Sequence, residues 1–490
     1  MTAEAPDILD SPEAAQRMIR GSALRTVSYI VSVLAGVAAL PLLFRHLGVV
    51  ETGRYVTVIT LVTIVGAVVE TGLAGISVRE FARAPAAGRR ALMADLIGLR
   101  LAALALAAAC AVAFMAVAGY GSVLLAGATV ALVGTLFESL SSTYGVSLSA
   151  SLRLGWLAAM LVVRQTVAVV LTLLLVLVEA PLIWFFALLI VASLAQWMVG
   201  WFATRSTIPH LPSRDARAWR DRIRGSAPYL GAMVLGVVYF RAAMILMALL
   251  STEVETGYFG VPFRLLEIVT LVAVMLMSSA LPILARSAQR DPVRYRHALS
   301  RLSEVGLIAG AWVAAVTLVA SGLVIEVLAG PGFEPSAAVL RVLTVSLALK
   351  FVVAGWALAL LSLEAYGAML MANAAAMAVA LVVSVVAVPA LGATGGALAT
   401  VAADLVIAGG YAWALRGAVH GSAIPGRTLR AVVLATGCAI GAALLTPGPD
   451  LARAALVTLV YGGIVLATKA LPRELAVALP KRRTPQKAAI

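Results

Sequence analysis

The sequence predicts an all-α integral membrane protein of about fourteen transmembrane helices: two parallel six-helix repeats form two lobes around a central cavity, followed by two extra C-terminal helices. Hydrophobic residues make up 62% of the chain and charged residues only 12%, whereas soluble domains carry about 25% charged residues. Apolar stretches of about 20 residues, enough to cross a bilayer, recur from Ser22 to Ala470. Short motifs also recur at one constant offset.

Glycine, proline and charged residues divide the apolar text into the expected helices. The predicted spans are 22–44, 54–78, 91–117, 122–150, 154–178, 181–203, 226–250, 257–284, 299–324, 336–363, 367–390, 394–416, 429–446 and 451–470. The predicted domains are a cytosolic tail at 1–21, an N-lobe at 22–203 with helices 1–6, a basic cytoplasmic linker at 204–225, a C-lobe at 226–416 with helices 7–12, helices 13–14 at 429–470, and a basic cytosolic tail at 471–490.

Lysine and arginine are enriched in cytoplasmic loops, so their distribution predicts the orientation. With the N-terminus inside, the inner segments carry 27 of the 37 Lys and Arg residues and the outer segments carry 3, namely Arg45, Arg54 and Arg453. We therefore expect a multi-pass protein of the bacterial inner membrane with both termini cytoplasmic. The linker, with Trp219 among alternating charges, is expected to form a short amphipathic interfacial helix.

Composition and motifs argue against several function classes. Cys110 and Cys438 lie inside apolar stretches, so neither a disulfide framework nor a cysteine metal site is expected. The four histidines, at 46, 210, 297 and 420, fall outside the spans. No metal cluster, P-loop, serine elbow or redox motif appears, and the outer loops are too short for a catalytic domain. We expect no enzyme and no cofactor. We read the net charge of +14 as membrane topology, not as nucleic-acid binding.

Two motifs indicate an internal repeat. Arg-Gly-Ser-Ala occurs at 20–23 and 224–227, and Glu-Thr-Gly occurs at 51–53 and 255–257, both at an offset of 204. Tyr55 and Tyr258 follow the second motif in each copy. Because six spans is an even number, both copies enter the membrane in the same sense. Parallel repeats of this kind are related by an axis along the membrane normal, with the transport cavity at their interface.

Several short segments resemble the multidrug/oligosaccharidyl-lipid/polysaccharide exporter superfamily. Arg45–Gly48 followed by Thr52–Tyr55 is similar to its arginine, leucine-glycine, then glycine-x-tyrosine pattern after helix 1, and Gly72-Leu73 with Val78–Glu80 resembles the end of its helix 2. Leu281–Ala285 resembles the proline at the end of helix 8, and Leu391–Ala397 the glycine-rich start of helix 12. The resemblance covers roughly residues 20–416. Within the superfamily, the sequence looks most like the polysaccharide-repeat-unit flippases.

This resemblance implies a flippase that moves a polyprenyl-diphosphate-linked oligosaccharide from the inner to the outer leaflet for cell-envelope polysaccharide biosynthesis, by alternating access. The implied partners are the lipid-linked glycan and membrane lipid, with a coupling ion and a polysaccharide polymerase as further candidates and no nucleic acid. An ion-coupled multidrug exporter of the same architecture is the alternative. A membrane glycosyltransferase or polymerase is disfavoured because the short loops leave no room for its chemistry.

Ionisable residues inside a membrane cost about 2.5–3.5 kcal/mol on insertion scales, so they usually face a cavity or a partner. Glu70 and Arg100 are predicted at like depth on neighbouring helices, as are Glu138 and Arg164. We expect Glu138 and Arg164 to form a structural ion pair. For Glu70 and Arg100, a structural ion pair and a role in the cavity are equally good explanations. Lys350 and Asp404, each in the middle of a span, are expected to pair with each other. A coupling-ion role for Asp404 is the lesser alternative.

In the resembled family, helices 1, 2, 7 and 8 line the cavity. Carried onto this sequence, those helices contribute Arg25, Glu70, Arg241, Arg264 and Glu267. The arginines suit a diphosphate or an acidic sugar, because a planar guanidinium binds oxyanions through two parallel hydrogen bonds. Arg25 and Arg264 lie near the interfaces and are equally explained by snorkelling. Arg241 lies about two-thirds of the way across and is the foremost candidate for substrate binding.

The orientation gives the first testable prediction. An impermeant thiol reagent applied from outside should label Thr252→Cys and Gly332→Cys, because both positions fall in predicted outer loops. It should not reach Ser213→Cys or Gln289→Cys, which fall in predicted inner loops. Labelling of intact cells before and after permeabilisation measures this difference. The reverse pattern would overturn the orientation.

Overall fold

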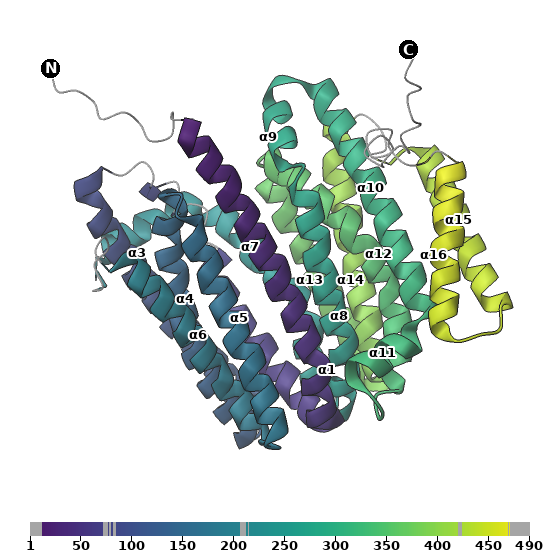
Figure 1. Ribbon diagram of the computed structural model, residues 1–490, viewed down its shortest axis with the longest axis horizontal. Coiled ribbons are helices and arrows are strands. Elements are labelled where there is room, and N and C mark those ends of the chain that lie inside the picture. The colour runs from purple at the N-terminus through teal and green to yellow at the C-terminus, as the bar shows by residue number, and fades with distance from the viewer. Residues whose placement is uncertain are drawn as a thin grey trace, which may run out of the picture. The chain divides into compact units, whose positions relative to one another are not determined.

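A computed structural model describes residues 12–71, 77, 80–81, 85–205, 212–213, 215–419, 424–468 and 470. Throughout this described part every regular element is a helix, which confirms the predicted all-α class (Figure 1). The helices are α1 (Pro12–Thr71), α3 (Ala86–Val117), α4 (Ser122–Ala150), α5 (Leu154–Leu177), α6 (Leu182–Thr204), α7 (Ala216–Leu250), α8 (Glu253–Ser278), α9 (Leu281–Arg290), α10 (Pro292–Val319), α11 (Ser321–Ala329), α12 (Pro335–Ser362), α13 (Tyr366–Leu391), α14 (Ala393–Val419), α15 (Gly426–Leu445) and α16 (Asp450–Ala467).

The first helix contains a reversal that decides the number of membrane crossings. Across the described residues, 13 helices are long and apolar enough to cross a membrane, and the first of these runs for 44 residues, Val27–Glu70. At 1.5 Å per residue that is about 66 Å, roughly twice the hydrocarbon thickness. Gly48 breaks it, with φ +67° and ψ −176°, and the purple helix turns back at its lower end (Figure 1). Counting its two arms separately turns 13 crossing segments into 14.

Two predicted helix limits differ from those in the structure. The linker at 204–225 was expected to hold a separate interfacial helix around Trp219, but Trp219 lies in the first turns of the continuous helix α7. Packing explains the difference: Ser213 N donates to Ala94 O at 2.9 Å, and a Cβ on Gly98 would come within 2.8 Å of the Trp219 ring. This segment therefore packs on α3.

The second difference concerns the basic stretch after α8. The predicted span 257–284 ends earlier, at Ser278, and the expected loop before residue 299 is helical, forming α9 and the first turns of α10. Proline starts both helices, Pro282 in α9 and Pro292 in α10. Proline suits a first helical turn because its missing N–H would have no partner there. The Asp291 side chain caps α10 by accepting from Arg294 N at 2.9 Å.

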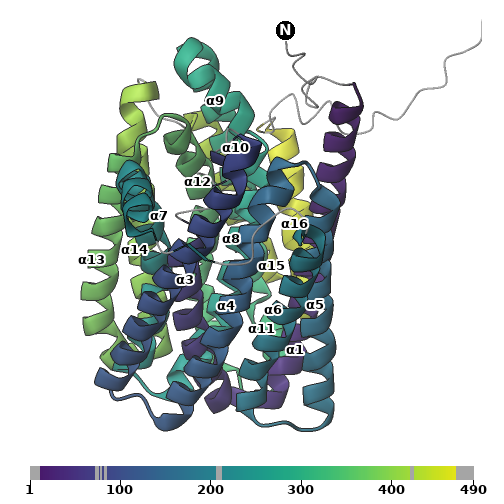
Figure 2. The same ribbon diagram turned by 90° about the vertical axis from the view of Figure 1, so that its left-hand side faces the viewer.

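The chain divides into two compact units. Unit 1 comprises Met1–Gly260 with Val327–Gly332, and unit 2 comprises Val261–Glu326 with Phe333–Ile490. Within each unit the long helices run side by side (Figure 2). Helix α7 belongs to unit 1 because it packs on α1 and α3. The two units are defined by which residues pack together and not by the internal repeat. The lobe boundary expected at 204–225 therefore stays a prediction.

Each unit has its own close-packed interior. In unit 1, Val65 and Val69 of α1 meet Ala128 and Ala131 of α4 and the fully buried Phe186 of α6. In unit 2 the C-terminal pair α15 and α16 packs on α10 through five alanines, one valine and one tyrosine: Ala315, Ala431, Ala435, Ala439, Ala443, Val457 and Tyr461. Small residues let membrane helices approach closely, which is the main source of their packing energy in lipid.

Candidate functional site

Arg100 and Glu70 form a buried polar cluster in unit 1. The Arg100 side chain, on α3, is 2% exposed, and its Nη1 lies 3.5 Å from Glu70 Oε2 on α1. The same nitrogen donates to Thr143 Oγ1 at 3.1 Å and to Ser142 Oγ on α4. Arg100 Nε and Nη2 and Glu70 Oε1 find no hydrogen-bond partner among the described residues. The cluster thus joins three helices through one guanidinium group.

Lys350 and Asp404 form the most deeply buried ion pair among the described residues. Lys350 Nζ on α12 donates to Asp404 Oδ1 on α14 at 2.7 Å, and the two side chains are 4% and 3% exposed. Arg164 of α5 and Glu138 of α4 also meet, at 3.1 Å, but about a third of each side chain is exposed. A buried pair of this kind is costly to break, because removing one partner leaves a charge in a medium that cannot solvate it.

The three arginines predicted to bind substrate have different surroundings. Arg25 on α1 is exposed, and Arg241 on α7 is half-buried beside the buried residues Ala242 and Ala243. Arg264 on α8 lies 2.6 Å from Glu267 Oε2, one helical turn along. Arg25 and Arg241 belong to unit 1 and Arg264 to unit 2. Their common role in binding the substrate therefore stays a prediction.

Two glycines make reciprocal contacts between α1 and α8, a feature that the sequence analysis missed. A Cβ added to Gly53 would collide with the carbonyl oxygen of Glu253, and a Cβ added to Gly257 would collide with that of Val49. Gly257 is Gly53 plus 204, and Glu253 is Val49 plus 204. Each glycine thus meets the counterpart of the residue that the other glycine meets. This reciprocity is the pattern of a two-fold symmetric contact.

A third contact lies on the local axis of this pattern. A Cβ on Gly260 would lie 2.7 Å from Val56 Cγ2, and Gly260 is Val56 plus 204, so the residue meets its own counterpart. Thr52 and Thr256, which are also counterparts, are 0% and 1% exposed. Arg54 reinforces the contact by pairing with Glu253 at 2.9 Å and with Glu51 at 2.6 Å. We call the residues 49–56 and 253–260 the glycine contact.

The repeat offset was the signal that would have found this contact. The Glu-Thr-Gly motif, seen twice, marks the segments that meet, but a repeat alone does not say which of its parts touch. Glycine is required at both positions because the backbones approach too closely for any side chain. The close fit can therefore hold segments 49–56 and 253–260 together. Separating them would break both glycine contacts at once.

The fold of this chain, with its many helices of membrane-crossing length, is shared by solved membrane transporters. The solved lipid II flippase MurJ, in an inward closed conformation, superposes with a TM-score of 0.74 at 11% identity, covering 92% of this chain and 99% of that one. An inward-facing multidrug resistance MATE family transporter of the MOP superfamily gives 0.61 at 12% identity, covering 79% and 95%. The eukaryotic MATE transporter AtDTX14 gives 0.58 at 12% identity, covering 82% and 99%.

The family follows from the sequence. The family described as polysaccharide biosynthesis protein matches residues 18–288, which is more than half of the 490 residues. This chain therefore belongs to the polysaccharide biosynthesis protein family, and the predicted resemblance to the exporter superfamily is confirmed. No curated protein matches the sequence.

The buried Lys350–Asp404 pair predicts an asymmetry between single and double substitutions. Lys350→Met alone should destabilise the protein by about 3–5 kcal/mol, because Asp404 would lose this ammonium group. Lys350→Met with Asp404→Leu should recover most of that loss, since apolar residues often replace a buried pair at no cost. Thermal unfolding in detergent measures both. Asp450→Ala, at the exposed pair with Arg453, is the control and should change stability by less than about 1 kcal/mol. Equal losses in the single and double variants would contradict this account.

The glycine contact predicts coupled effects. Gly53→Val and Gly257→Val should each cost about 1–3 kcal/mol of stability by overpacking. The double variant should cost less than the sum, because the first substitution already separates the segments that the second would separate. Gly441→Val on α15, where an added Cβ meets nothing within 4 Å, is the matched control. Additive losses, or losses no larger than that of the control, would refute the reciprocal contact.

Proposed function

We propose that this protein is a flippase that moves a polyprenyl-diphosphate-linked oligosaccharide from the inner to the outer leaflet of the cell membrane for cell-envelope polysaccharide biosynthesis. The family match over residues 18–288 carries the proposal, because it ties a membrane protein of this fold to polysaccharide assembly. The substrate has a diphosphate, a sugar chain and a lipid tail. Its membrane crossing calls for a polar, anion-binding path closed from the lipid.

The chemistry of the substrate fits the arginines on α1, α7 and α8. A diphosphate oxyanion binds guanidinium groups through paired hydrogen bonds, and Arg241 is the candidate at greatest predicted depth. Arg25, exposed near the predicted cytoplasmic end of α1, would attract the headgroup first. Arg264, close to Glu267, would take part only at the outer end. Glu70 and Arg100, joined through α4, are assigned to holding the helices and not to the substrate.

Alternating access is the proposed mechanism. The glycine contact joins counterpart segments next to a predicted outer loop, so in this structure it would close the outer side. Release would require its two segments to separate, while entry occurs from the inner side. The inside-negative potential favours outward movement of an anion by about 2.3 kcal/mol per charge per 100 mV. A coupling ion and a polysaccharide polymerase remain proposed partners.

An ion-coupled multidrug exporter is the second candidate, favoured by the likeness of the fold to MATE transporters. Exporters of cationic drugs would need carboxylates facing the substrate, and arginines at 25, 241 and 264 would repel such cargo. Glu70 and Glu267, the carboxylates that the resemblance places in the cavity, lie beside Arg100 and Arg264. The charge balance supports the flippase.

Substitution of Arg241 tests this function. Arg241→Ala should abolish translocation of a lipid-linked oligosaccharide in proteoliposomes while the protein still reaches the membrane and folds. Arg241→Lys, which keeps the charge but loses the fork geometry, should retain part of the rate. Arg453→Ala, at a partly exposed arginine in the first turns of α16, is the control and should transport normally. Wild-type transport by Arg241→Ala would show that the site assignment is wrong.

A further inference from the structure

The corner between α9 and α10 lies at a face of the membrane. It joins two membrane-crossing helices, Glu253–Ser278 and Pro292–Val319, so it must sit where the chain leaves and re-enters the bilayer. Helix α10 has 28 residues, which is about 42 Å at 1.5 Å per residue and exceeds the hydrocarbon thickness of about 30 Å. Its first turns carry Arg294 and Arg296 and therefore suit the headgroup region on either side, because arginine is costly in the hydrocarbon.

This corner is held firmly. On α9, Leu284 is 0% exposed and Ser287 3% exposed, and the helix packs on α12 and α10. At the start of α10, the buried Tyr295 donates its hydroxyl to Ala359 O of α12 at 2.9 Å. The backbone cap from Asp291 fixes the first turn. Side chains on the outer faces of both helices are thus presented from a rigid support.

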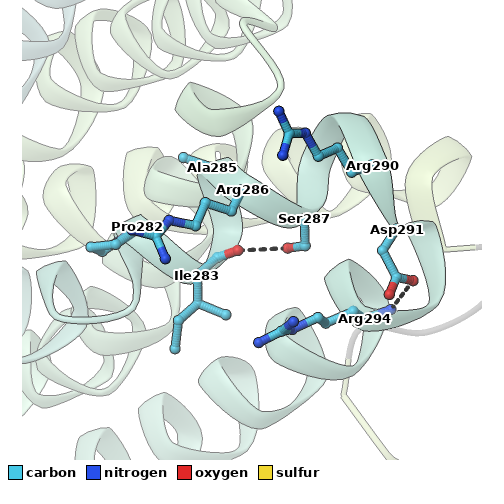
Figure 3. Close-up of a pocket in the computed structure, with 8 residues that line it drawn as sticks. All are labelled: Pro282, Ile283, Ala285, Arg286, Ser287, Arg290, Asp291 and Arg294. Carbon is cyan, nitrogen blue, oxygen red and sulfur yellow. Dashed lines mark hydrogen bonds between the residues drawn. The ribbon is translucent and has the colours of Figure 1, made fainter.

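A basic pocket of about 770 Å³ opens in this corner (Figure 3). Its lining residues, drawn as sticks in Figure 3, are Pro282, Ile283, Ala285, Arg286, Ser287, Arg290, Asp291 and Arg294. The lining holds three arginines and one aspartate, so it carries a formal charge of +2. All three arginines are exposed, and the Asp291 carboxylate already accepts from the backbone of Arg294. The pocket is therefore suited to an anion.

Apolar side chains beside the arginines indicate the form of that anion. Ile283, in the lining, is 50% exposed, and Val293, between Asp291 and Arg294, is 74% exposed. A site for a soluble anion gains nothing from exposed isoleucine and valine. At a membrane face, however, arginines and adjoining apolar side chains match the two parts of an amphiphile, its charged headgroup and its acyl chains. Both parts are present on α9 and the first turn of α10.

We propose that this α9–α10 pocket binds the phosphate headgroup of an anionic phospholipid from the surrounding bilayer. Arg286 and Arg290, one helical turn apart on α9, and Arg294 on α10 contact the phosphate, while Ile283 and Val293 contact the start of the acyl chains. Basic pockets at the ends of transmembrane helices bind anionic headgroups in this way. The bound lipid would anchor the α8–α9–α10 turn in one leaflet. The site is separate from Arg241, so the inference stands independently of the flippase proposal.

Lipid titration of the full-length protein tests this inference. In an uncharged detergent, dioctanoyl phosphatidylglycerol should bind and raise the thermal unfolding temperature, whereas dioctanoyl phosphatidylcholine should do so only weakly. Arg286→Gln with Arg290→Gln and Arg294→Gln should weaken phosphatidylglycerol binding on the order of 10–100-fold. Arg296→Gln is the matched control, because Arg296 is equally exposed on α10 but does not line the pocket. It should bind as wild type does.

Several outcomes would overturn the inference. Equal binding of phosphatidylcholine would show that the pocket does not recognise the negative charge of the headgroup. Competition by inorganic phosphate at matched concentration would indicate a site for a soluble anion, and tighter binding of farnesyl diphosphate would indicate a diphosphate site. An equal loss in Arg296→Gln would indicate diffuse surface charge. Should the triple variant not fold, Arg294→Gln alone decides, because the Asp291 cap uses the backbone of residue 294. It should weaken binding several-fold, and wild-type binding by it would refute the site.

Discussion

The hydrocarbon core of a bilayer offers no hydrogen-bond partner to the backbone, so each crossing segment must satisfy its own N–H and C=O groups. That constraint explains why every regular element among the described residues is a helix. It also explains why the one sharp reversal near the start of the chain falls at Gly48, where a positive φ of 67° costs a glycine little.

The same solvent makes charged groups informative. Lys350 and Asp404 are nearly inaccessible and lie 2.7 Å apart, and Arg100 shares its guanidinium among Glu70 and hydroxyls of α4. Such groups hold helices in register, because separating them would expose a charge to lipid. Arg241 and Arg25, in contrast, lie on helices whose counterparts line the cavity of the resembled family. The buried pairs thus stabilise the packing of the helices, whereas Arg25 and Arg241 are proposed to bind the substrate.

The glycine contact and the α9–α10 pocket show how small local choices give a membrane protein specific surfaces. Glycine at 53 and 257 permits two backbones to meet. In the proposed transport cycle this contact closes the outer side, and it opens when the two segments separate. At the membrane face, two arginines of α9 and one in the first turn of α10 line a basic pocket beside exposed apolar residues. The first feature concerns movement across the membrane, and the second concerns anchoring within one leaflet.

The sequence by itself determined the membrane class, the positions of most spans, the 204-residue repeat and the family resemblance, because helix formation in lipid depends on local apolar length. Only the tertiary structure decided which helices touch. Lipid provides no hydrophobic driving force between helices, so contacts are selected by the close packing of small residues and by polar pairs, which hydropathy does not reveal. Thus the meeting of Gly53 with Glu253, the packing of Trp219 on Gly98 and the gathering of Arg286, Arg290 and Arg294 around one pocket emerged only from the fold.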